Sequence, residues 1–303
     1  MIYVGRSPMT GATTEGLLTT GLDDGTAPLK PAVYIVGAGP GDPELLTLKA
    51  YRLLAQADVI LVADSLVPQQ VLQGVRSDAE IVRTANKTLE DMLPLMIDRV
   101  RSRKSVVRLH SGDPSLYSAI HEQMQLLAAA DIPFEVIPGI SAFQAAAARL
   151  KVELTLPGLV QTIILTRISG RTQVPDAEDL ASLAAHKASL CLYLSARHVE
   201  PAQAQLMAHY APDTPVAICF RLGWPDEQIW LTPLSQMAAT TQEKDLIRTT
   251  LYVISPALAA AGEPFETSVR SRLYNPEHDH LFRRSRIATG IQPDQPSLEN
   301  SRK

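Results

Sequence analysis

The pattern of apolar and polar residues in the first half of the chain predicts strands and helices in alternation. Short apolar runs predict buried strands over 33–36, 59–62, 79–85, 105–110 and 133–138. Between them, apolar residues at helical spacing predict helices over 43–57, 88–102, 115–130 and 141–150. Since helices separate successive strands, this half is expected to fold as an α/β domain with a mostly parallel sheet.

The second half has a different pattern. Strands are expected over 162–167, 189–195, 215–221, 227–233 and 249–255, and helices over 176–186, 198–210 and 233–243. Only "LGWPD" separates the third and fourth of these strands, which is the length of a hairpin connection. A mixed sheet is therefore predicted. Two dissimilar α/β domains in series also predict a ligand cleft between them.

These patterns divide the chain into five parts. We expect an N-terminal extension over 1–31, an α/β domain over 32–150, a linker over 151–161, a mixed α/β domain over 162–260 and a tail over 261–303. The extension is rich in Thr and Gly and lacks the pattern of a signal peptide. His278 and His280 in the tail could bind a metal, but a solvated tail is the simpler interpretation.

Composition narrows the possible partners. The 303 residues carry a net charge of −4 and no apolar run long enough for a membrane span, which argues against nucleic acid and membrane partners. Cys191 and Cys219 lie inside apolar runs, so buried free thiols in a reducing, cytoplasmic compartment are expected. No metal site is predicted from these two thiols.

The first glycine-rich loop, "GAGPGDP", resembles a dinucleotide-binding loop but departs from it. Gly37 and Gly39 are placed correctly, and Asp64 follows the second strand, near the position of a ribose-binding acid. However, Asp42 occupies the position of the third glycine, where its carboxylate would face a pyrophosphate. Three interpretations stay open: a dinucleotide site, a turn without a ligand, and a site for a ligand without phosphates.

Two further turns follow predicted strands, "HSGDPSLYSA" and "IPGISAF". The carboxyl ends of parallel strands meet at one edge of the sheet, where ligands bind. A second Gly-Asp-Pro sequence, at 112–114, suits a ligand with hydroxyl groups and a positive charge, and S-adenosylmethionine is such a ligand. The alternative for both Asp42 and Asp113 is capping of the following helix.

The stretches "VYIVGAGPGDPELLTLKA", "VVRLHSGDPSLYSA", "EVIPGISAFQAAAA" and "ISGRTQVPDAEDLASLAAH" resemble the tetrapyrrole methylases, over roughly 32–256. The resemblance implies two dissimilar α/β domains, S-adenosylmethionine as methyl donor in the cleft between them, a tetrapyrrole substrate and a homodimer. "GWPDEQIW" and the segment after Gly170 are similar to members that methylate a precorrin in cobalamin synthesis. Methylation at another ring position, as on precorrin-2 or uroporphyrinogen III, is the nearest alternative, and an NAD-dependent oxidoreductase is a distant one.

The resemblance also places site residues. Contacts to the methyl donor are expected from Pro40, Gly112, Asp113, Leu116, Ser141, Ala142, Leu194, Gly223 and Thr250. Asp64 matches a position where some relatives carry a proposed proton acceptor.

Tetrapyrroles carry many carboxylates, so the substrate site should present cations. Arg171, Arg83, Lys87 and Arg197 are the main candidates, with Arg108 and Arg167 beside them. Arg171 lies inside a family-like motif and is preferred. His110 and His198 also flank the predicted turns, but structural histidines are the better interpretation. Methyl transfer from a sulfonium needs neither a metal nor a covalent enzyme intermediate, so positioning is the expected contribution of the protein.

Overall fold

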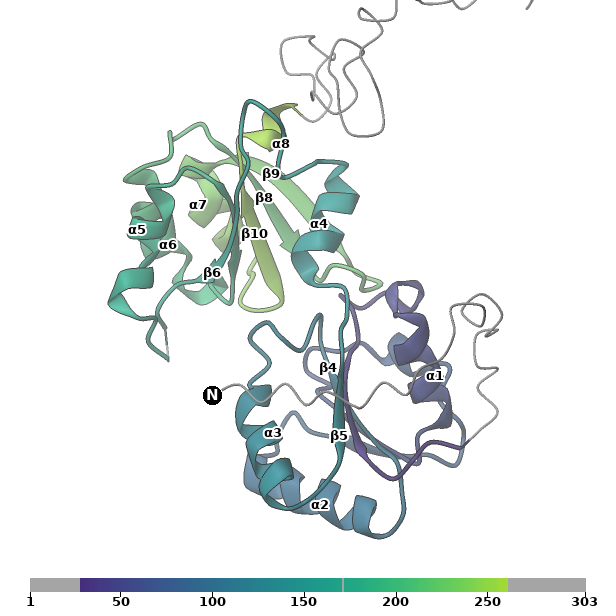
Figure 1. Cartoon of the computed structure of the whole chain (residues 1–303). Helices are drawn as coiled ribbons and strands as arrows, with labels where there is room; N and C mark the ends of the chain where they lie inside the picture. The colour runs from purple at the N-terminus through teal and green to yellow at the C-terminus, as the bar shows by residue number, and fades with distance from the viewer. Residues whose placement is uncertain (1–27, 171, 261–303) are drawn as a thin grey trace, which may run out of the picture. The chain divides into compact units, whose positions relative to one another are not determined.

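The computed structural model describes residues 28–170 and 172–260 (Figure 1). The chain separates into two compact units between Ile140 and Ser141. Each unit contains one five-stranded sheet. The residues outside the described ranges include Arg171, His278 and His280, so the predictions made for them have no structural counterpart here.

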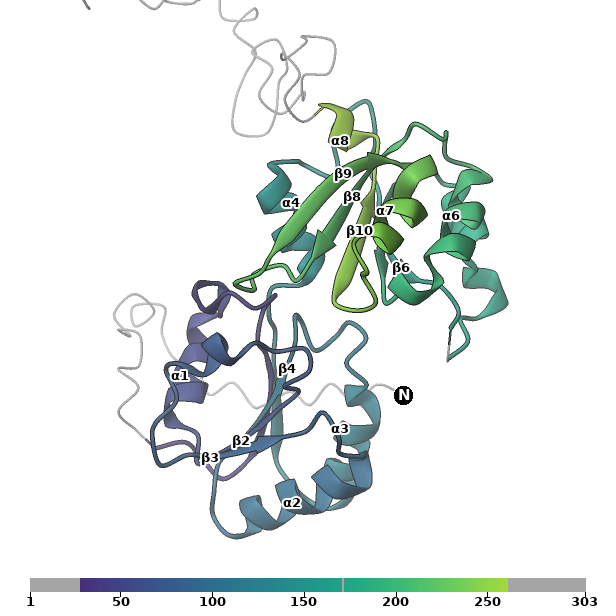
Figure 2. The same cartoon turned by 180° about the vertical axis from the view of Figure 1, so that it is seen from behind.

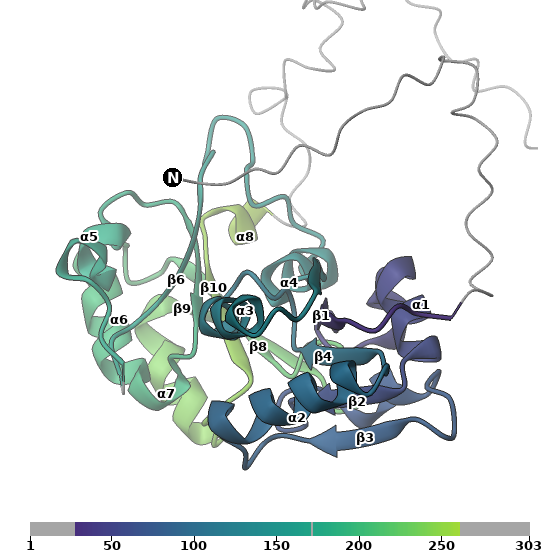
Figure 3. The same cartoon turned by 60° about the horizontal axis from the view of Figure 1, so that its bottom comes forward.

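The first unit has the predicted parallel sheet. Its strands are β1 (Val33–Gly37), β2 (Val59–Val62), β3 (Glu80–Arg83), β4 (Val106–His110) and β5 (Phe134–Ile137), in the order β3-β2-β4-β1-β5. All four pairings are parallel. The face carrying Tyr34, Val36 and Ile60 packs against α1 (Leu48–Gln56). The opposite face packs against α2 (Leu89–Arg101) and α3 (Ile120–Ala129), as Figures 2 and 3 show.

The second unit has the predicted mixed sheet. Its strands are β6 (Ile163–Arg167), β7 (Ser189–Tyr193), β8 (Pro215–Phe220), β9 (Gln228–Pro233) and β10 (Thr250–Ile254), in the order β6-β7-β10-β8-β9. Only β6 and β7 pair in parallel, and β8 and β9 form the expected antiparallel pair. Because β10 runs antiparallel to β7 and β8, it begins at the edge of the sheet where those strands end, and its first residue, Thr250, pairs with Phe220, the last residue of β8.

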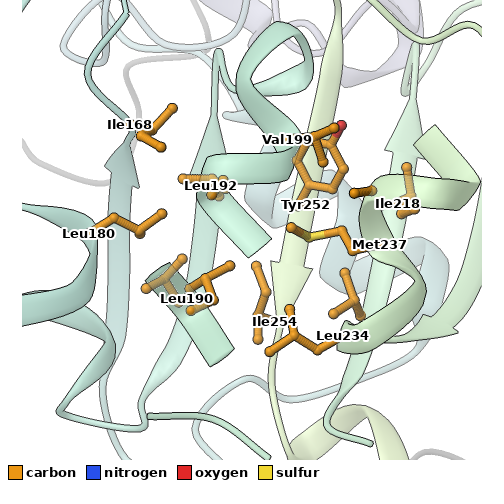
Figure 4. Close-up of a cluster of buried hydrophobic side chains, with 14 of the residues drawn as sticks. Ile168, Leu180, Leu190, Leu192, Val199, Ile218, Leu234, Met237, Tyr252 and Ile254 are labelled. Atoms are coloured by element: carbon orange, nitrogen blue, oxygen red, sulfur yellow. The ribbon is translucent and has the colours of Figure 1, made fainter. Parts of the chain in front are cut away.

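Helices cover both faces of the second sheet. On one face, Leu190, Leu192, Tyr252 and Ile254 pack against α5 (Leu180–Ala184), α6 (Val199–Met207) and α7 (Met237–Glu243), as Figure 4 shows. On the other face lie α4 (Ala142–Leu150) and α8 (Ala257–Ala260), with buried Cys191 and Cys219. Both thiols are free, and burial raises the pKa of each to about 12.

The helix over 142–150 differs from its predicted assignment. The pattern of the sequence assigns it to the first domain, but Ala146 packs in the same cluster as Cys191 and Val253 of the second sheet. The predicted linker over 151–161 also belongs to this unit, because Leu154 is buried in the same cluster and its carbonyl accepts a hydrogen bond from Ser189 Oγ. A helix belongs to the unit whose sheet its apolar face packs against. The boundary between the units therefore lies before this helix, close to the Pro138-Gly139 break.

In the first unit, two helices begin well after the residue that the periodicity predicts. Asp42 caps only a 3-10 turn, Pro43–Leu45, and α1 begins six residues after Asp42, with Thr47 as its cap. The third helix begins at Ile120 instead of 115, because Tyr117 and Ala119 adopt left-handed backbone conformations. Both differences lengthen the loops at the carboxyl edge of the first sheet. Among the described helices, none is long and apolar enough to cross a membrane.

Candidate functional site

Three glycines from different loops meet at the carboxyl edge of the first sheet. A Cβ atom on Gly139 would lie 2.3 Å from the carbonyl oxygen of Gly112, and one on Gly37 would lie 2.6 Å from the Gly139 nitrogen. Such distances are too short for any side chain, so the loops after β1, β4 and β5 touch backbone to backbone. The three predicted turns are therefore brought together, as expected for a ligand-binding edge.

Backbone hydrogen bonds join two of these loops. Gly39 and Gly112 form an isolated antiparallel bridge, in which Gly112 N donates to Gly39 O at 2.7 Å. Both residues have positive φ, of 68° and 65°, which glycine adopts at little cost. Pro40, next to the bridge, is buried, and Leu116 is partly buried in the second loop. The predicted methyl-donor contacts of the first unit thus lie in two loops that are tied to each other.

Both oxygens of the Asp113 carboxylate accept hydrogen bonds from other groups of the protein. Its Oδ2 accepts a hydrogen bond from Gly139 N at 2.9 Å, and its Oδ1 accepts one from Ser115 N at 2.8 Å and another from Ser115 Oγ. Burial alone would raise the pKa of Asp113, but the hydrogen bonds from Ser115 and Gly139 outweigh it, and the net shift is downward. Asp113 therefore ties the second turn to the third as well as capping its own turn.

The first turn is poorly suited to a pyrophosphate. Asp42 Oδ1 accepts from Glu44 N at 3.0 Å, and Gly41 O accepts from Gln70 Nε2 at 2.8 Å. A dinucleotide loop needs a helix N-terminus directed at the phosphates, whereas α1 begins only at Leu48. Asp42 therefore caps the 3-10 turn Pro43–Leu45 and not the α-helix that follows, and this geometry disfavours the dinucleotide site.

Asp64 also holds loops together. Its Oδ1 accepts hydrogen bonds from Thr84 N at 3.1 Å and Ala85 N at 3.0 Å, and its Oδ2 lies 3.8 Å from Arg83 Nη1. These contacts tie the end of β2 to the end of β3. Arg83 and Lys87 are exposed there, as a substrate-binding role requires.

Arg108 and His110 are buried on β4, which differs from the exposed cation expected at Arg108. Each is only 6% exposed, on the face covered by α2 and α3. Arg108 Nη1 donates to Thr84 Oγ1 at 3.0 Å, while Arg108 Nε and His110 Nε2 have no partner among the described residues. Burial lowers the pKa of Arg108 to about 10, and burial together with the charge of Arg108 lowers the pKa of His110 to about 3. Arg108 is therefore not available to a substrate at the surface.

In the second unit, the predicted contacts share one edge of the sheet. Leu194 follows β7, Gly223 lies in the β8–β9 turn, and Thr250 begins β10. Leu194 has a positive φ of 53°, and so do Arg221 and Thr249 at the same edge, with φ of 49° and 54°. This conformation is strained for residues with a side chain, and such strain concentrates at functional sites. Leu194 is also 65% exposed.

Ser141 and Ala142 begin α4, near the end of β7. Ser141 caps the helix in a capping box with Gln144, and its Oγ lies 3.0 Å from the hydroxyl of Tyr193. The same hydroxyl accepts from Phe143 N at 3.1 Å. Tyr193, which no sequence motif singles out, thus joins the N-terminus of α4 to the edge that carries Leu194.

Arg167 differs from the free cation expected at its position. Its guanidinium donates to the carbonyls of Thr172 and Gln173, both at 2.9 Å, and so holds the loop that follows β6. Arg197 is exposed and lines a cavity of about 270 Å³ together with residues of α6 and α7.

A second group missed from the sequence surrounds Arg221. Its guanidinium lies over the rings of Phe220 and Trp224, at 5.1 and 5.0 Å, and pairs with Asp226. The "GWPDEQIW" motif supplies Trp224 and Asp226, so two of the three partners lie in a motif that the sequence shows, although their packing against Arg221 cannot be read from it. Arg221 Nε and Trp224 Nε1 are buried with no partner among the described residues.

Comparison with known proteins defines the class. The family model of the Tetrapyrrole (Corrin/Porphyrin) Methylases matches residues 32–238. A precorrin-4 C(11)-methyltransferase of Pseudomonas aeruginosa is 43% identical over 251 residues, covering 83% of this chain and 98% of the relative. The chain therefore belongs to the tetrapyrrole methylases.

Solved structures agree with this assignment. The X-ray structure of a cobalt precorrin-4 methyltransferase of cobalamin biosynthesis is 41% identical and matches with a TM-score of 0.73, covering 77% of this chain and 97% of that chain. A uroporphyrin-III C-methyltransferase from Thermus thermophilus, complexed with S-adenosylhomocysteine, is 30% identical with a TM-score of 0.63, covering 76% of this chain and 99% of that one. The predicted fold class and family are thus confirmed.

Proposed function

We propose that this chain transfers a methyl group from S-adenosylmethionine to C-11 of precorrin-4 or of its cobalt complex. The observation that carries the proposal is the 43% identity to a precorrin-4 C(11)-methyltransferase along almost the whole of that relative. The more distant uroporphyrin-III relative, at 30% identity, makes methylation of that substrate the weaker alternative.

The residues of the first unit fit the methyl donor. The three-glycine contact brings backbone groups of three loops together without intervening side chains, which leaves N–H and C=O groups able to approach a flat nucleoside. The Asp113 carboxylate fixes this arrangement, so we assign it the role of positioning the loops around the donor. Pro40, Gly112 and Leu116 are proposed as direct contacts.

The second unit is proposed to contribute Ser141, Ala142, Leu194, Gly223 and Thr250. Leu194 is the best supported of these, because a strained and exposed leucine is costly to keep without a ligand to cover it. The substrate's carboxylates are proposed to meet Arg171, Arg83, Lys87 and Arg197. Bidentate pairing with arginine would fix the ring's orientation.

S-adenosylmethionine, when bound, supplies a methyl group on a positively charged sulfonium, which a nucleophilic ring carbon can attack in line. The protein's share is orientation and exclusion of water, and good alignment is worth roughly 7–11 kcal/mol of the barrier. Asp64 is engaged with two backbone N–H groups, so the geometry favours a structural role over proton transfer. A homodimer in the cytoplasm is our further expectation.

Calorimetric titration of the purified chain with S-adenosylhomocysteine, with NAD as the matched control, tests the cofactor. Saturable binding of the first ligand alone is expected. Turnover is then measured with precorrin-4, cobalt-precorrin-4 and uroporphyrinogen III, by mass spectrometry of the methylated product. Methylation of uroporphyrinogen III alone would overturn the proposed substrate, and binding of NAD alone would overturn the cofactor.

A further inference from the structure

The turn that follows β7 carries a strained residue between two residues whose side chains are fixed by hydrogen bonds. Leu194 has a φ of 53° and its side chain is 65% exposed, so packing of its own side chain does not hold it in this conformation. Tyr193 precedes it and Ser195 follows it. A strained conformation persists only where the surrounding structure over-determines it. The contacts of Tyr193 and Ser195 therefore decide where Leu194 lies.

Ser195 holds the carboxyl-terminal side of this turn. It is fully buried, and its Oγ donates to Tyr193 O at 2.6 Å. The same Oγ accepts a hydrogen bond at 3.3 Å from Ile168 N, the first N–H beyond the end of β6. The Ser195 side chain thus closes the turn around Leu194 and ties it to the neighbouring strand.

Tyr193 holds the other side of the turn through its hydroxyl. This group accepts from Phe143 N at 3.1 Å and lies 3.0 Å from Ser141 Oγ, so it is bonded to the first turn of α4. Phe143 N is one of the N–H groups at a helix N-terminus that have no partner within the helix. A phenol can accept from this N–H and share a second hydrogen bond with the serine hydroxyl. One side chain therefore sets the spacing between the start of α4 and the turn that carries Leu194.

We propose that Tyr193 and Ser195 are positioning residues that hold Leu194 and the start of α4 at the spacing that the methyl donor requires. The inference rests on the proposed function and deepens it, because Leu194 and the first residues at α4, Ser141 and Ala142, are proposed donor contacts. Tyr193 and Ser195 act on the donor only through these contacts. Since folding has already fixed the contacts, less conformational freedom is lost when the donor binds.

Removal of one hydroxyl tests the proposal. Tyr193→Phe keeps the ring but leaves Phe143 N and Ser141 Oγ without this partner, so the dissociation constant of S-adenosylhomocysteine, measured by calorimetry, should rise about tenfold. Tyr210→Phe is the matched control, because the Tyr210 hydroxyl donates to Ala188 O at 2.6 Å, next to the opposite end of β7. The control should change the dissociation constant less than about twofold, although it too loses a tyrosine hydrogen bond.

Ser195→Ala is a second, independent probe. It removes the hydroxyl that bonds to Tyr193 O and Ile168 N, and the dissociation constant of S-adenosylhomocysteine should rise about fivefold. Ser189→Ala is its control, since Ser189 is equally buried at the start of β7 and its Oγ donates to Leu154 O at 2.6 Å. This control should change the affinity less than about twofold.

A double-mutant cycle separates positioning from direct contact. Leu194→Ala should weaken S-adenosylhomocysteine about tenfold in the wild type but less than about threefold in Tyr193→Phe, because Leu194 is then no longer held against the ligand. A Tyr193 hydroxyl that touched the donor itself would instead give independent losses that add.

The outcomes separate the proposal from a merely structural role. Weaker donor binding in both probes, controls near wild type and a non-additive cycle support it. Unchanged donor affinity in both probes, equal losses in probes and controls, or an additive cycle overturns it. If Tyr193→Phe does not fold, Ser195→Ala and Ser189→Ala decide by the same comparison.

The wild-type chain distinguishes failure of the inference from failure of the proposed function. A chain that binds S-adenosylhomocysteine but does not methylate precorrin-4 refutes the proposed substrate alone, and the variants still decide the roles of Tyr193 and Ser195. A chain that does not bind S-adenosylhomocysteine refutes the proposed donor, and the inference with it.

Discussion

The two sheet edges that we propose to bind ligand are shaped by different kinds of residue. In the first unit, loops after three strands come into backbone contact, and glycines at 37, 112 and 139 make that contact possible. In the second unit, Leu194, Arg221 and Thr249 keep their side chains and accept left-handed conformations. The first edge therefore removes side chains to bring backbones together, while the second keeps side chains at the cost of strain.

This difference has a physical consequence. A glycine contact cannot tolerate an added atom, because the obstacle is backbone held by neighbouring strands. A strained leucine or threonine can be replaced by glycine without a clash, and the backbone strain is then relieved. Substitutions at the first edge should therefore lower the free energy of unfolding strongly. Substitutions at the second edge should change stability little, so that an effect on ligand affinity can be measured by itself.

The largest effect is expected from Gly139→Ala. Its Cβ would lie 2.3 Å from Gly112 O, so the loops after β4 and β5 must separate. Overpacking of this kind costs about 3 kcal/mol of unfolding free energy. Urea unfolding followed by circular dichroism measures the loss, and calorimetry should show S-adenosylhomocysteine affinity reduced at least about 100-fold. Gly74→Ala, whose Cβ would lie 3.0 Å from a ring carbon of Tyr51, serves as control, and equal behaviour of the two variants would contradict the close contact.

A second large effect concerns pH and His110. Its pKa is lowered to about 3, chiefly by burial and further by Arg108, so the unfolded chain binds a proton here that the folded chain does not. Stability should therefore fall as pH drops from about 6.5 towards 3, by up to about 1.4 kcal/mol per pH unit. His110→Leu should remove this dependence. Urea unfolding at pH 7 and pH 4.5 compares the two chains, and parallel losses would argue against a buried neutral imidazole.

A smaller loss is expected from Asp113→Asn. The amide keeps the shape but offers only one acceptor oxygen, so either Gly139 N or Ser115 loses its partner at a cost of about 2 kcal/mol near neutral pH. Since the folded-state pKa of Asp113 lies below its ordinary value of 3.8, the carboxylate's contribution is present above that value and is lost as pH falls below it.

The measurement for Asp113→Asn is urea unfolding at pH 7 and pH 3. The difference in unfolding free energy between wild type and variant should shrink at the lower pH. Ser182→Ala, which removes a hydroxyl hydrogen bond to the helix-capping Asp179 of the second unit, provides a comparison away from both edges. A difference that is independent of pH would show that ionisation of Asp113 contributes nothing.

The smallest stability effects belong to the second edge. Thr249→Gly relieves the left-handed strain of a β-branched residue and should raise the unfolding free energy by about 1 kcal/mol. Leu194→Ala should change stability by less than about 0.5 kcal/mol, because the side chain is largely exposed. The same substitution should weaken S-adenosylhomocysteine about tenfold if Leu194 covers the ligand. Unchanged affinity would remove Leu194 from the proposed site.

The comparison also shows how far sequence reasoning reaches. Each strand in the described part of the chain lies near its predicted bounds. The prediction is easiest for buried runs such as 59–62, which are apolar on both faces and stand out against their surroundings. Helix beginnings were less predictable. Pro43 and Ser115 look like helix starts locally, yet α1 and α3 begin later because contacts between loops override local preference.

For two arginines the structure differs from the prediction, because contacts formed in the folded chain decide where their side chains lie. Arg108 and Arg167 both lie near strand ends, where an exposed cation is a reasonable expectation. The structure buries one under two helices and engages the other with loop carbonyls. Neither contact can be read from the sequence. Arg108 donates to the hydroxyl of Thr84, an ordinary polar residue, and Arg167 donates to a backbone carbonyl, that of Gln173.

The sequence by itself determined the succession of two α/β sheets, the family and the loops in which we propose the site, because periodicity and Gly-Asp-Pro turns are local properties of the chain. Only the tertiary structure decided that Gly37, Gly112 and Gly139 touch, that Asp113 binds Gly139 N, and that α4 belongs to the second unit. These are contacts between residues far apart in the chain. Their geometry follows from strand order and packing, which no single stretch of sequence encodes.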